Sequence, residues 1–383
     1  MDVLLTEEQK MLKDLCRQIA REKIKPVAAE YDEKEEFPWP IVKILADSDI
    51  MGVYIPEQYG GMGGGTFELA IATEELSWGC GGIALAFAAT GLGTFPILLF
   101  GNEEQKKKYL TKIAKGTIAA FCITEAEAGS DAGSIKTTAV KDGNHYVLNG
   151  TKQWITNGGE ADIYTVIAMT DKTKGARGAT AFIVEKGTKG LDFGKKEKKL
   201  GIRGSATREV VFTDCKVPKE NVLAREGMGF IAAMKTFDYS RPGVAAQALG
   251  IAQRALDEAV SYSHERKQFG QSISSFQGIQ FMMADMAIQV EAARALVYQA
   301  ARIIDAGAKD ISKISAMAKT FASDVAMKVT TDAVQILGGY GYMREYPVEK
   351  LMRDAKITQI YEGTNQIQRT IIAASLIKEL KKK

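Results

Sequence analysis

The hydrophobic pattern of this 383-residue chain changes its period twice, and this constrains the fold more than any other feature. The first part shows apolar residues at helical spacing, such as Leu12, Cys16 and Ile19, behind a capping box at Thr6–Gln9. The middle part consists of short β-branched runs between turn signals, including a hairpin at 137–148. The last part is helical again. The sequence therefore predicts three domains, at residues 1–117, 118–226 and 227–383.

The predicted fold class is α+β: an N-terminal helical domain, a middle antiparallel β-barrel or sandwich, and a C-terminal helical bundle. The long helices of the bundle are expected at 230–262, 276–306, 312–337 and 364–380. No G-x-G-x-x-G motif follows a predicted strand, which tells against a Rossmann domain. In the first domain, Gly91, Gly93 and Pro96 are expected to interrupt a helix at 83–100, and interrupted helices often border cavities.

Composition excludes several classes of function. The chain has 50 basic and 47 acidic residues, and its net charge of +3 gives no electrostatic footprint for nucleic acid. The four cysteines are scattered and the two histidines, His145 and His264, are far apart, so no metal site is predicted and a reducing compartment is expected. No segment approaches the ~20 apolar residues of a membrane span, and the N-terminus lacks a targeting pattern. We therefore expect a cytoplasmic protein without a membrane span.

Two stretches in the middle of the chain are suited to a phosphorylated, aromatic cofactor. The small residues of Thr124–Asp131 let backbone N–H groups approach a ligand, and Thr124 and Ser130 add hydroxyl donors. A plain turn is the alternative for this loop. Trp154 stands close to the hydroxyl of Thr156, so the pair would cover an aromatic ring, although a single Trp in a strand usually belongs to the core.

The last domain carries further candidates. Asp238 and Arg241 share one helix face, where they either pair with each other or hold an external polar group. The alternative is a surface ion pair of little energetic value. Arg266 follows the same helix, and its planar guanidinium suits a pyrophosphate. The glycine-rich stretch 335–341 is either a ligand contact or a helix C-cap.

Glu362 is the candidate base. It follows an aromatic residue and precedes Gly363, a helix breaker, so it is poorly placed inside a helix and well placed to point into a cavity from a loop. A solvated surface acid is the alternative.

Seven motifs in register resemble the acyl-CoA dehydrogenase family, of the short- and medium-chain bacterial type, over essentially the whole chain. They are TEAEAGSD (124–131), WITNGG (154–159), DYSRP (238–242), ERKQFG (265–270), QILGGYGY (335–342), MRDAKI (352–357) and IYEGTNQIQ (360–368). The family usually has Pro where this chain has Ala126, which predicts only a slightly looser loop.

The resemblance implies a tightly held FAD and a homotetramer built on the C-terminal helices. It implies that FAD is bound by Phe121, Ile123, Thr124, Ser130, Trp154, Ile155 and Thr156, by Thr364 and Gln366, and, across a subunit boundary, by Arg266, Gln268, Phe269, Gln335, Gly338 and Gly339. It also implies that Ser130, Ser205, Asp238, Arg241 and Gly363 contact the CoA thioester.

The implied reaction is α,β-dehydrogenation of an acyl-CoA thioester, with electrons passed to an electron-transfer flavoprotein. Glu362 would take the α-proton, and FAD would accept the β-hydride. Isovaleryl- and long-chain relatives carry their base where this chain has Ser240, so Glu362 is the only matching base. An acyl-CoA oxidase is one alternative, disfavoured because oxidases of this fold are generally longer. A non-catalytic flavin-binding relative is another, and an intact Glu362 opposes it.

The acyl group is predicted to be short or medium, with branched and alicyclic groups left open. Its pocket floor is expected to come from 87–93, Tyr361 and Leu337.

Overall fold

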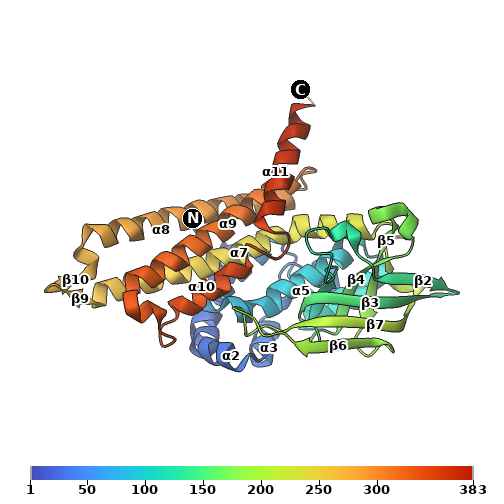
Figure 1. Cartoon of the computed structure of the whole chain (residues 1–383), viewed down its shortest axis with the longest axis horizontal. Coiled ribbons are helices and arrows are strands. Elements are labelled where there is room, and N and C mark those ends of the chain that lie inside the picture. Colours follow the sequence, from blue (N-terminus) through green and yellow to red (C-terminus); the bar gives the residue numbers. More distant parts are fainter. Residues whose placement is uncertain (1, 382–383) are drawn as a thin grey trace.

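The computed structural model describes residues 2–381, so Met1 and the last two residues of the predicted third domain lie outside it. A β domain forms one end of the molecule, and long helices run from it to the other end (Figure 1). The N-terminal helices pack against both. The predicted order of helices, strands and helices is confirmed, and with it the α+β fold class.

The N-terminal domain begins with the predicted capping box. The Thr6 hydroxyl accepts a hydrogen bond from Gln9 N at 3.3 Å, and the Gln9 side chain accepts one from Thr6 N at 3.1 Å. This pairing satisfies donors that the first helical turn leaves free. The helices of the domain are α1 (Glu7–Ile19), α2 (Ala28–Lys34), α3 (Trp39–Asp47), α4 (Thr66–Gly79), α5 (Gly81–Phe100) and α6 (Glu103–Ala114).

The helix α5 runs unbroken through Gly91, Gly93 and Pro96, so the expected interruption is wrong. Pro96 lies near the C-terminal end, where its missing N–H removes only one hydrogen bond of the helix. Gly93 serves close packing instead: a Cβ there would lie 2.7 Å from the backbone nitrogen of Ala120, on the adjacent strand β1 (Ala119–Cys122). The helix still borders a cavity, which is described below.

The expectation that no segment approaches the length of a membrane span is also wrong. α5 has 20 residues with a mean hydropathy of 2.0, which is long and apolar enough by composition. However, 72% of this stretch is buried inside the protein, where it packs against β1 and the long helix α7 (Gly229–Glu265). Its apolar character is that of a core helix.

The middle domain is one eight-stranded sheet. Most neighbours are antiparallel, including the predicted hairpin of β2 and β3, but β4 pairs in parallel with both β1 and β2. The all-antiparallel expectation is therefore wrong at these two pairings, which join segments far apart in the chain. The remaining strands are β2 (Thr138–Asp142), β3 (His145–Thr156), β4 (Ile163–Met169), β5 (Ala179–Glu185), β6 (Leu191–Lys196), β7 (Thr207–Pro218) and β8 (Val222–Leu223).

The four long helices predicted for the last domain are confirmed. α7 continues through Pro242 as one helix of 37 residues. The short helix α10 was not predicted. The C-terminal helix α11 projects away from the body of the protein (Figure 1), and Leu376, Ile377 and Leu380 are exposed on it. The other elements are β9 (Lys267–Gln268), β10 (Gln271–Ser272), α8 (Gln277–Asp305), α9 (Ser312–Leu337), α10 (Val348–Ile357) and α11 (Asn365–Leu380).

Candidate active site

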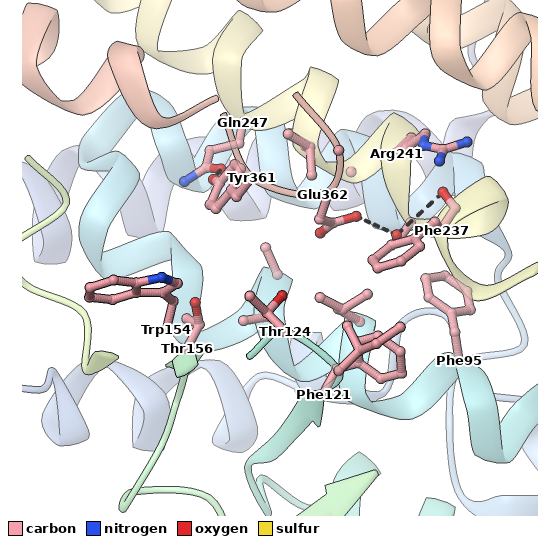
Figure 2. A pocket seen from close by; sticks show the side chains of 18 of the residues that line it. Phe95, Phe121, Thr124, Trp154, Thr156, Phe237, Arg241, Gln247, Tyr361 and Glu362 are labelled. Atoms are coloured by element: carbon pink, nitrogen blue, oxygen red, sulfur yellow. Dashed lines mark hydrogen bonds between the residues drawn. The ribbon is translucent and has the colours of Figure 1, made fainter. Parts of the chain in front are cut away.

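A cavity opens where α5, the β domain, α7 and the segment between α10 and α11 meet (Figure 2). With its mouth it encloses about 1310 Å³. This volume includes space at the mouth that is open to solvent. Most of the polar side chains that line it belong to residues that the sequence singled out.

Glu362 enters the cavity from a left-handed turn. Its φ is 52° and that of Gly363 is 90°, conformations that favour glycine at the second position and end any helical continuation from α10. The Gln368 side chain donates to both carbonyl oxygens of this turn at 3.0 Å, and Thr364 caps the start of α11. The predicted loop position of Glu362 is therefore confirmed, and the turn is held from the helix that follows it.

The carboxylate of Glu362 is surrounded by protein except where it faces the cavity. The Ser240 hydroxyl on α7 donates a hydrogen bond to it (Figure 2). Burial raises the pKa of Glu362, while the Ser240 hydrogen bond and the charges of Arg241 and Lys319 act in the opposite direction. Such a balance gives a carboxylate that is more basic than a surface glutamate and still ionisable, which a general base requires.

Asp238 and Arg241 form the predicted pair, at 2.9 Å, but the pair is buried and not on the surface. Asp238 also accepts a hydrogen bond from the Ser312 hydroxyl at 2.6 Å. Arg241 lines the cavity, and its Nε is a buried donor for which the described residues 2–381 provide no partner. A buried donor of this kind is costly unless a ligand or water accepts its hydrogen bond.

The opposite wall is aromatic and carries hydroxyls. Phe121, Thr124, Trp154 and Thr156 face Glu362 across the cavity (Figure 2). Trp154 is not a core residue: it is 59% exposed, with φ of 59°. The pairing of β3 with β7 is irregular between Lys152 and Ile155, and such a bulge re-aims a side chain from its regular direction.

The loop Thr124–Asp131 is tied to β3 by a buried ion pair. Lys152 Nζ lies 2.7 Å from Glu125 Oε1 and donates to the Ile123 carbonyl at 3.0 Å. Glu125 also accepts from the backbone nitrogens of Lys136 and Thr137. Although burial acts to raise it, the pKa of Glu125 is lowered, first by the charge of Lys152. The loop is thus held in place by a buried ion pair and by hydrogen bonds to distant residues, which a plain turn does not require.

A second group of predicted residues lies elsewhere. A groove at the β9–β10 end of the long helices, far from the β domain in Figure 1, is lined by Arg266, Gln268, Phe269, Gly338 and Gly339. Phe269 is 94% exposed. In one chain these residues do not meet the cavity of Glu362.

Some predicted residues line neither space. Ser205 is buried and donates to the Ile202 carbonyl at 2.7 Å, Thr364 is the α11 cap, and Gln335, Gln366 and Asp238 lie outside both linings. Leu337, expected in the acyl pocket floor, lines the groove instead. By contrast, the other predicted cavity residues line it as expected: Ile123, Ser130, Ile155, Arg241 and Gly363.

Sequence reasoning missed three polar residues around Glu362. Ser240 was noted only as a position without an acid. Gln247 on α7 accepts the hydrogen bond of the Tyr361 hydroxyl, and the buried Lys319 on α9 contacts the turn. Lys319 stands among alanines in Ala316–Ala322, and a lysine at such a core-like position was a usable signal.

Among residues 2–381 no group of three or more His, Cys, Asp or Glu side chains is arranged to hold a metal ion.

Three family models cover most of the chain. They describe the acyl-CoA dehydrogenase N-terminal domain at residues 6–117, the middle domain at 120–215 and the C-terminal domain at 227–377. The short-chain specific acyl-CoA dehydrogenase of Clostridium acetobutylicum is 51% identical over 380 residues, covering 99% of this chain and 100% of that protein.

Two solved structures are similar in both fold and sequence. Butyryl-CoA dehydrogenase from Megasphaera elsdenii has a TM-score of 0.96 and 49% identity, covering 98% of this chain and 100% of the other. A chain in a structure described as "Electron transferring flavoprotein of Acidaminococcus fermentans: Towards a mechanism of flavin-based electron bifurcation" has a TM-score of 0.96 and 52% identity, covering 98% and 99%.

The three family models place this chain among the flavoprotein oxidoreductases, and its helical, β and helical parts around an aromatic cavity with a half-buried Glu362 agree with that class. This chain belongs to the acyl-CoA dehydrogenase family. It has acyl-CoA dehydrogenase activity, as the resemblance implied.

One solved structure limits the argument from length against the oxidase alternative. A prolyl acyl carrier protein oxidase structure, with a TM-score of 0.93 and 33% identity, covers 97% of this chain and 99% of its own. An oxidase of this fold thus has the same length, so length does not separate oxidases from dehydrogenases.

Proposed function

We propose that this chain catalyses FAD-dependent α,β-dehydrogenation of a short- or medium-chain acyl-CoA, with Glu362 as the base. The observation that carries the proposal is the placement of Glu362. Its carboxylate stands on a left-handed turn, accepts a hydrogen bond from the Ser240 hydroxyl, and faces an aromatic wall across an open cavity. A base and a flat cofactor surface on opposite sides suit removal of a proton and a hydride from adjacent carbons.

The residues of the cavity fit a flavin. Trp154 and Thr156 offer an indole face and a hydroxyl, Thr124 and Ser130 add hydroxyl donors, and a Cβ at Gly129 would meet no atom within 4 Å, so the loop leaves space beside it. These residues, with Phe121, Ile123 and Ile155, are proposed to hold FAD; Thr364 and Gln366 are proposed to hold its pyrophosphate side. Bound FAD supplies the two-electron acceptor for the substrate hydride.

The chain's own groups are proposed to manage the proton and the thioester. Glu362 takes the α-proton, and its backbone N–H donates to the thioester oxygen as negative charge develops there. Arg241, whose Nε is free of any partner among residues 2–381, donates to a polar group of the substrate, and Asp238 fixes its guanidinium. Gly363, Ser130 and Ser205 complete the proposed thioester contacts.

The part of the cavity proposed to receive the acyl group is apolar. Leu85, Ala88 and Ala89 of α5 line it, and Ile202 packs behind Leu85 and Ala89 in a small buried cluster. Tyr361 covers the same end, with its hydroxyl bonded to Gln247. This buried cluster is proposed to close the acyl pocket and so to favour a short chain, and the small side chains of Ala88 and Ala89 are proposed to leave room for branched or alicyclic groups.

A panel of acyl-CoA thioesters tests this substrate class. Anaerobic flavin bleaching is expected to be fastest with butyryl- or hexanoyl-CoA and at least ~10-fold slower beyond octanoyl-CoA, because each misplaced methylene costs about 1–3 kcal/mol. Isobutyryl- and cyclohexanecarbonyl-CoA report on branched and alicyclic acyl groups. Faster bleaching by lauroyl- than by butyryl-CoA would contradict the proposed preference for a short acyl chain.

The electron acceptor is proposed to be an electron-transfer flavoprotein, and the location is proposed to be cytoplasmic. Reduced enzyme mixed with electron-transfer flavoprotein is expected to reoxidise much faster than in air alone. Rapid reoxidation by air with peroxide release would instead show an acyl-CoA oxidase. Full FAD content without bleaching by any acyl-CoA would show a non-catalytic flavin-binding relative.

The exposed groove at the β9–β10 end is proposed to receive the FAD of a neighbouring subunit in a homotetramer. Arg266, Gln268 and Phe269, with Gln335, Gly338 and Gly339, would meet that FAD. An aromatic side chain that is 94% exposed, as Phe269 is, favours a contact made only in the assembly. The projecting helix α11, with its exposed Leu376 and Ile377, supports the same assembly.

Replacing Arg266 by Ala is expected to weaken FAD retention about tenfold or more while the subunit stays folded. A charge-assisted bond to a pyrophosphate is worth roughly 1.5–3 kcal/mol. The measurement is FAD content after gel filtration, together with the apparent Kd for FAD. Lys267→Ala, at the adjacent exposed position, is the control. Unchanged FAD retention in the Arg266 variant would remove it from the proposed site.

A further inference from the structure

Lys319 is a fully buried lysine directly behind the turn that carries Glu362. It lies in the middle of α9 with 0% of its surface exposed. Its Nζ donates to the Gly363 carbonyl at 2.8 Å and to Asn365 Oδ1 at 2.9 Å. Both acceptors belong to the three residues that follow Glu362. The ammonium group therefore binds the turn that carries Glu362, and Lys319 is not among the residues that line the cavity.

The turn keeps other hydrogen bonds besides those of this lysine. The Gly363 carbonyl also accepts from Gln368 at 3.0 Å. Asn365 Oδ1 lies 3.2 Å from the Ser323 hydroxyl, whose single proton has a shorter acceptor in the Lys319 carbonyl at 2.7 Å. Burying an ammonium group is nevertheless expensive, and a hydrophobic side chain of similar volume often serves stability as well or better. Its charge therefore has a use other than holding the fold.

The charges around Glu362 indicate that the positive charge of Lys319 acts on this carboxylate. Two cations act on Glu362: Arg241, which is already paired with Asp238, and Lys319, which has no carboxylate within salt-bridge distance among the residues described. Burial lowers the pKa of Lys319 to about 7, against the opposing pull of Glu362.

Other groups act more weakly on Lys319. On its own helix, Asp324 favours the charged form of Lys319, but this carboxylate is engaged with Arg369 of α11 at 2.7 Å. Arg241 of α7 opposes the charge of Lys319. Tyr361, on the same turn as Glu362, is neutral because burial raises its pKa well above the ordinary value. Glu362 is thus the acid that Lys319 acts on most directly.

We propose that Lys319 is a positioning residue that fixes the Glu362–Gly363 turn and biases Glu362 toward the carboxylate form that the base must have. The inference rests on the proposed role of Glu362. Lys319 acts through the turn and through its charge, and it touches neither the cavity nor the reacting atoms.

The sign of the effect follows from the charge. The base works deprotonated, so kcat/KM falls as pH drops through the pKa of Glu362 in the free enzyme. Removing a nearby positive charge disfavours the carboxylate and raises that pKa. The acid limb of the pH profile must then move to higher pH, while the rate on the alkaline plateau changes little.

Two variants separate charge from hydrogen bonding. Lys319→Met keeps an apolar stem and loses both the charge and the donor, and Lys319→Gln loses the charge but keeps an amide donor. The acid limb of kcat/KM for butyryl-CoA is expected to move up by about one pH unit in both, a roughly tenfold loss of activity at pH below the limb. Lys328→Met, at an exposed position on the same helix, is the control and should leave the limb in place.

FAD content and melting temperature are measured alongside the pH profiles. A uniform loss of activity at every pH with an unmoved limb would overturn the proposal, because that is the behaviour of a purely structural residue. Failure of both variants to fold would overturn it too, since the lysine would then be required for folding. Failure of the base assignment is recognised separately, by an active Glu362→Gln enzyme.

Discussion

Replacing Glu362 by Gln is expected to abolish most of the dehydrogenase activity, with a fall in kcat on the order of a thousandfold or more. The amide has nearly the same shape, and the Ser240 hydroxyl can still donate to its oxygen. It cannot accept the α-proton at neutral pH. The loss therefore measures proton abstraction and not a change in the shape of the cavity.

The measurement is anaerobic stopped-flow bleaching of the flavin by butyryl-CoA, with FAD content and thioester affinity measured in parallel. Both binding measurements should stay near those of the unmodified enzyme, because Glu362 is proposed to act in chemistry and not in holding either ligand. Glu345→Gln, at an exposed position outside the cavity lining, is the control. A variant at Glu362 that bleaches its flavin at near the original rate would move the base to another residue.

The location of Glu362 was predictable because its signal is local. An aromatic residue before it and a glycine after it indicate a turn, and φ values of 52° and 90° confirm one. The long helices were predictable for a similar reason, since apolar periodicity over many residues averages out local exceptions. What lies within a few residues of sequence could be inferred directly.

The partners of Glu362 were harder to predict because they come from distant segments. Ser240 lies 122 residues before it in the chain, and Lys319 contacts Gly363 across 44 residues. Only the packing of α7 and α9 brings them together. The orientation of Trp154 depends on the register between β3 and β7, and a shift by one residue reverses the face of a side chain. Periodicity fixes faces within an element but not the register between elements.

Two errors have the same origin. The expected break in α5 rested on glycine and proline propensity, but tertiary packing overrides a weak local preference. Gly93 is needed there because the backbone of Ala120 comes so close. The parallel pairing of β1 with β4 joins strands separated by forty residues, which turn signals cannot reveal.

The second large effect is expected for Lys152→Met. This change breaks the buried ion pair of Lys152 with Glu125, which ties the loop 124–131 to β3. Lys152 is 0% exposed, and its removal leaves Glu125 as a buried carboxylate without its cation. Breaking such a pair from one side costs about 3–5 kcal/mol, which corresponds to a fall in Tm on the order of 10 °C. Thermal unfolding followed by circular dichroism measures it.

The same ion pair connects the two parts of the proposed flavin site, so the loss of stability should be accompanied by a loss of FAD. Lys152 donates to the Ile123 carbonyl and to Glu125. The next residue of β3, Gln153, donates from its backbone nitrogen to the Thr124 carbonyl at 2.8 Å. Two consecutive residues of β3 therefore bind the start of the loop. The same strand ends with Trp154 and Thr156. FAD content of Lys152→Met is therefore expected to fall with its melting temperature, and excess FAD should restore part of both.

A double variant distinguishes the ion pair from simple loss of packing. Lys152→Met combined with Glu125→Gln removes both charges, and the single Gln oxygen can still accept from one of the two backbone nitrogens, of Lys136 or Thr137, that Glu125 binds. It is expected to be more stable than Lys152→Met alone, because no unpaired charge remains buried. Glu127→Gln breaks the exposed Glu127–Lys136 pair as the control and should cost no more than about 1 kcal/mol. If the double variant were less stable than the single one, the carboxylate of Glu125 would stabilise the loop through its backbone contacts alone, and Lys152 would matter only for the volume it fills.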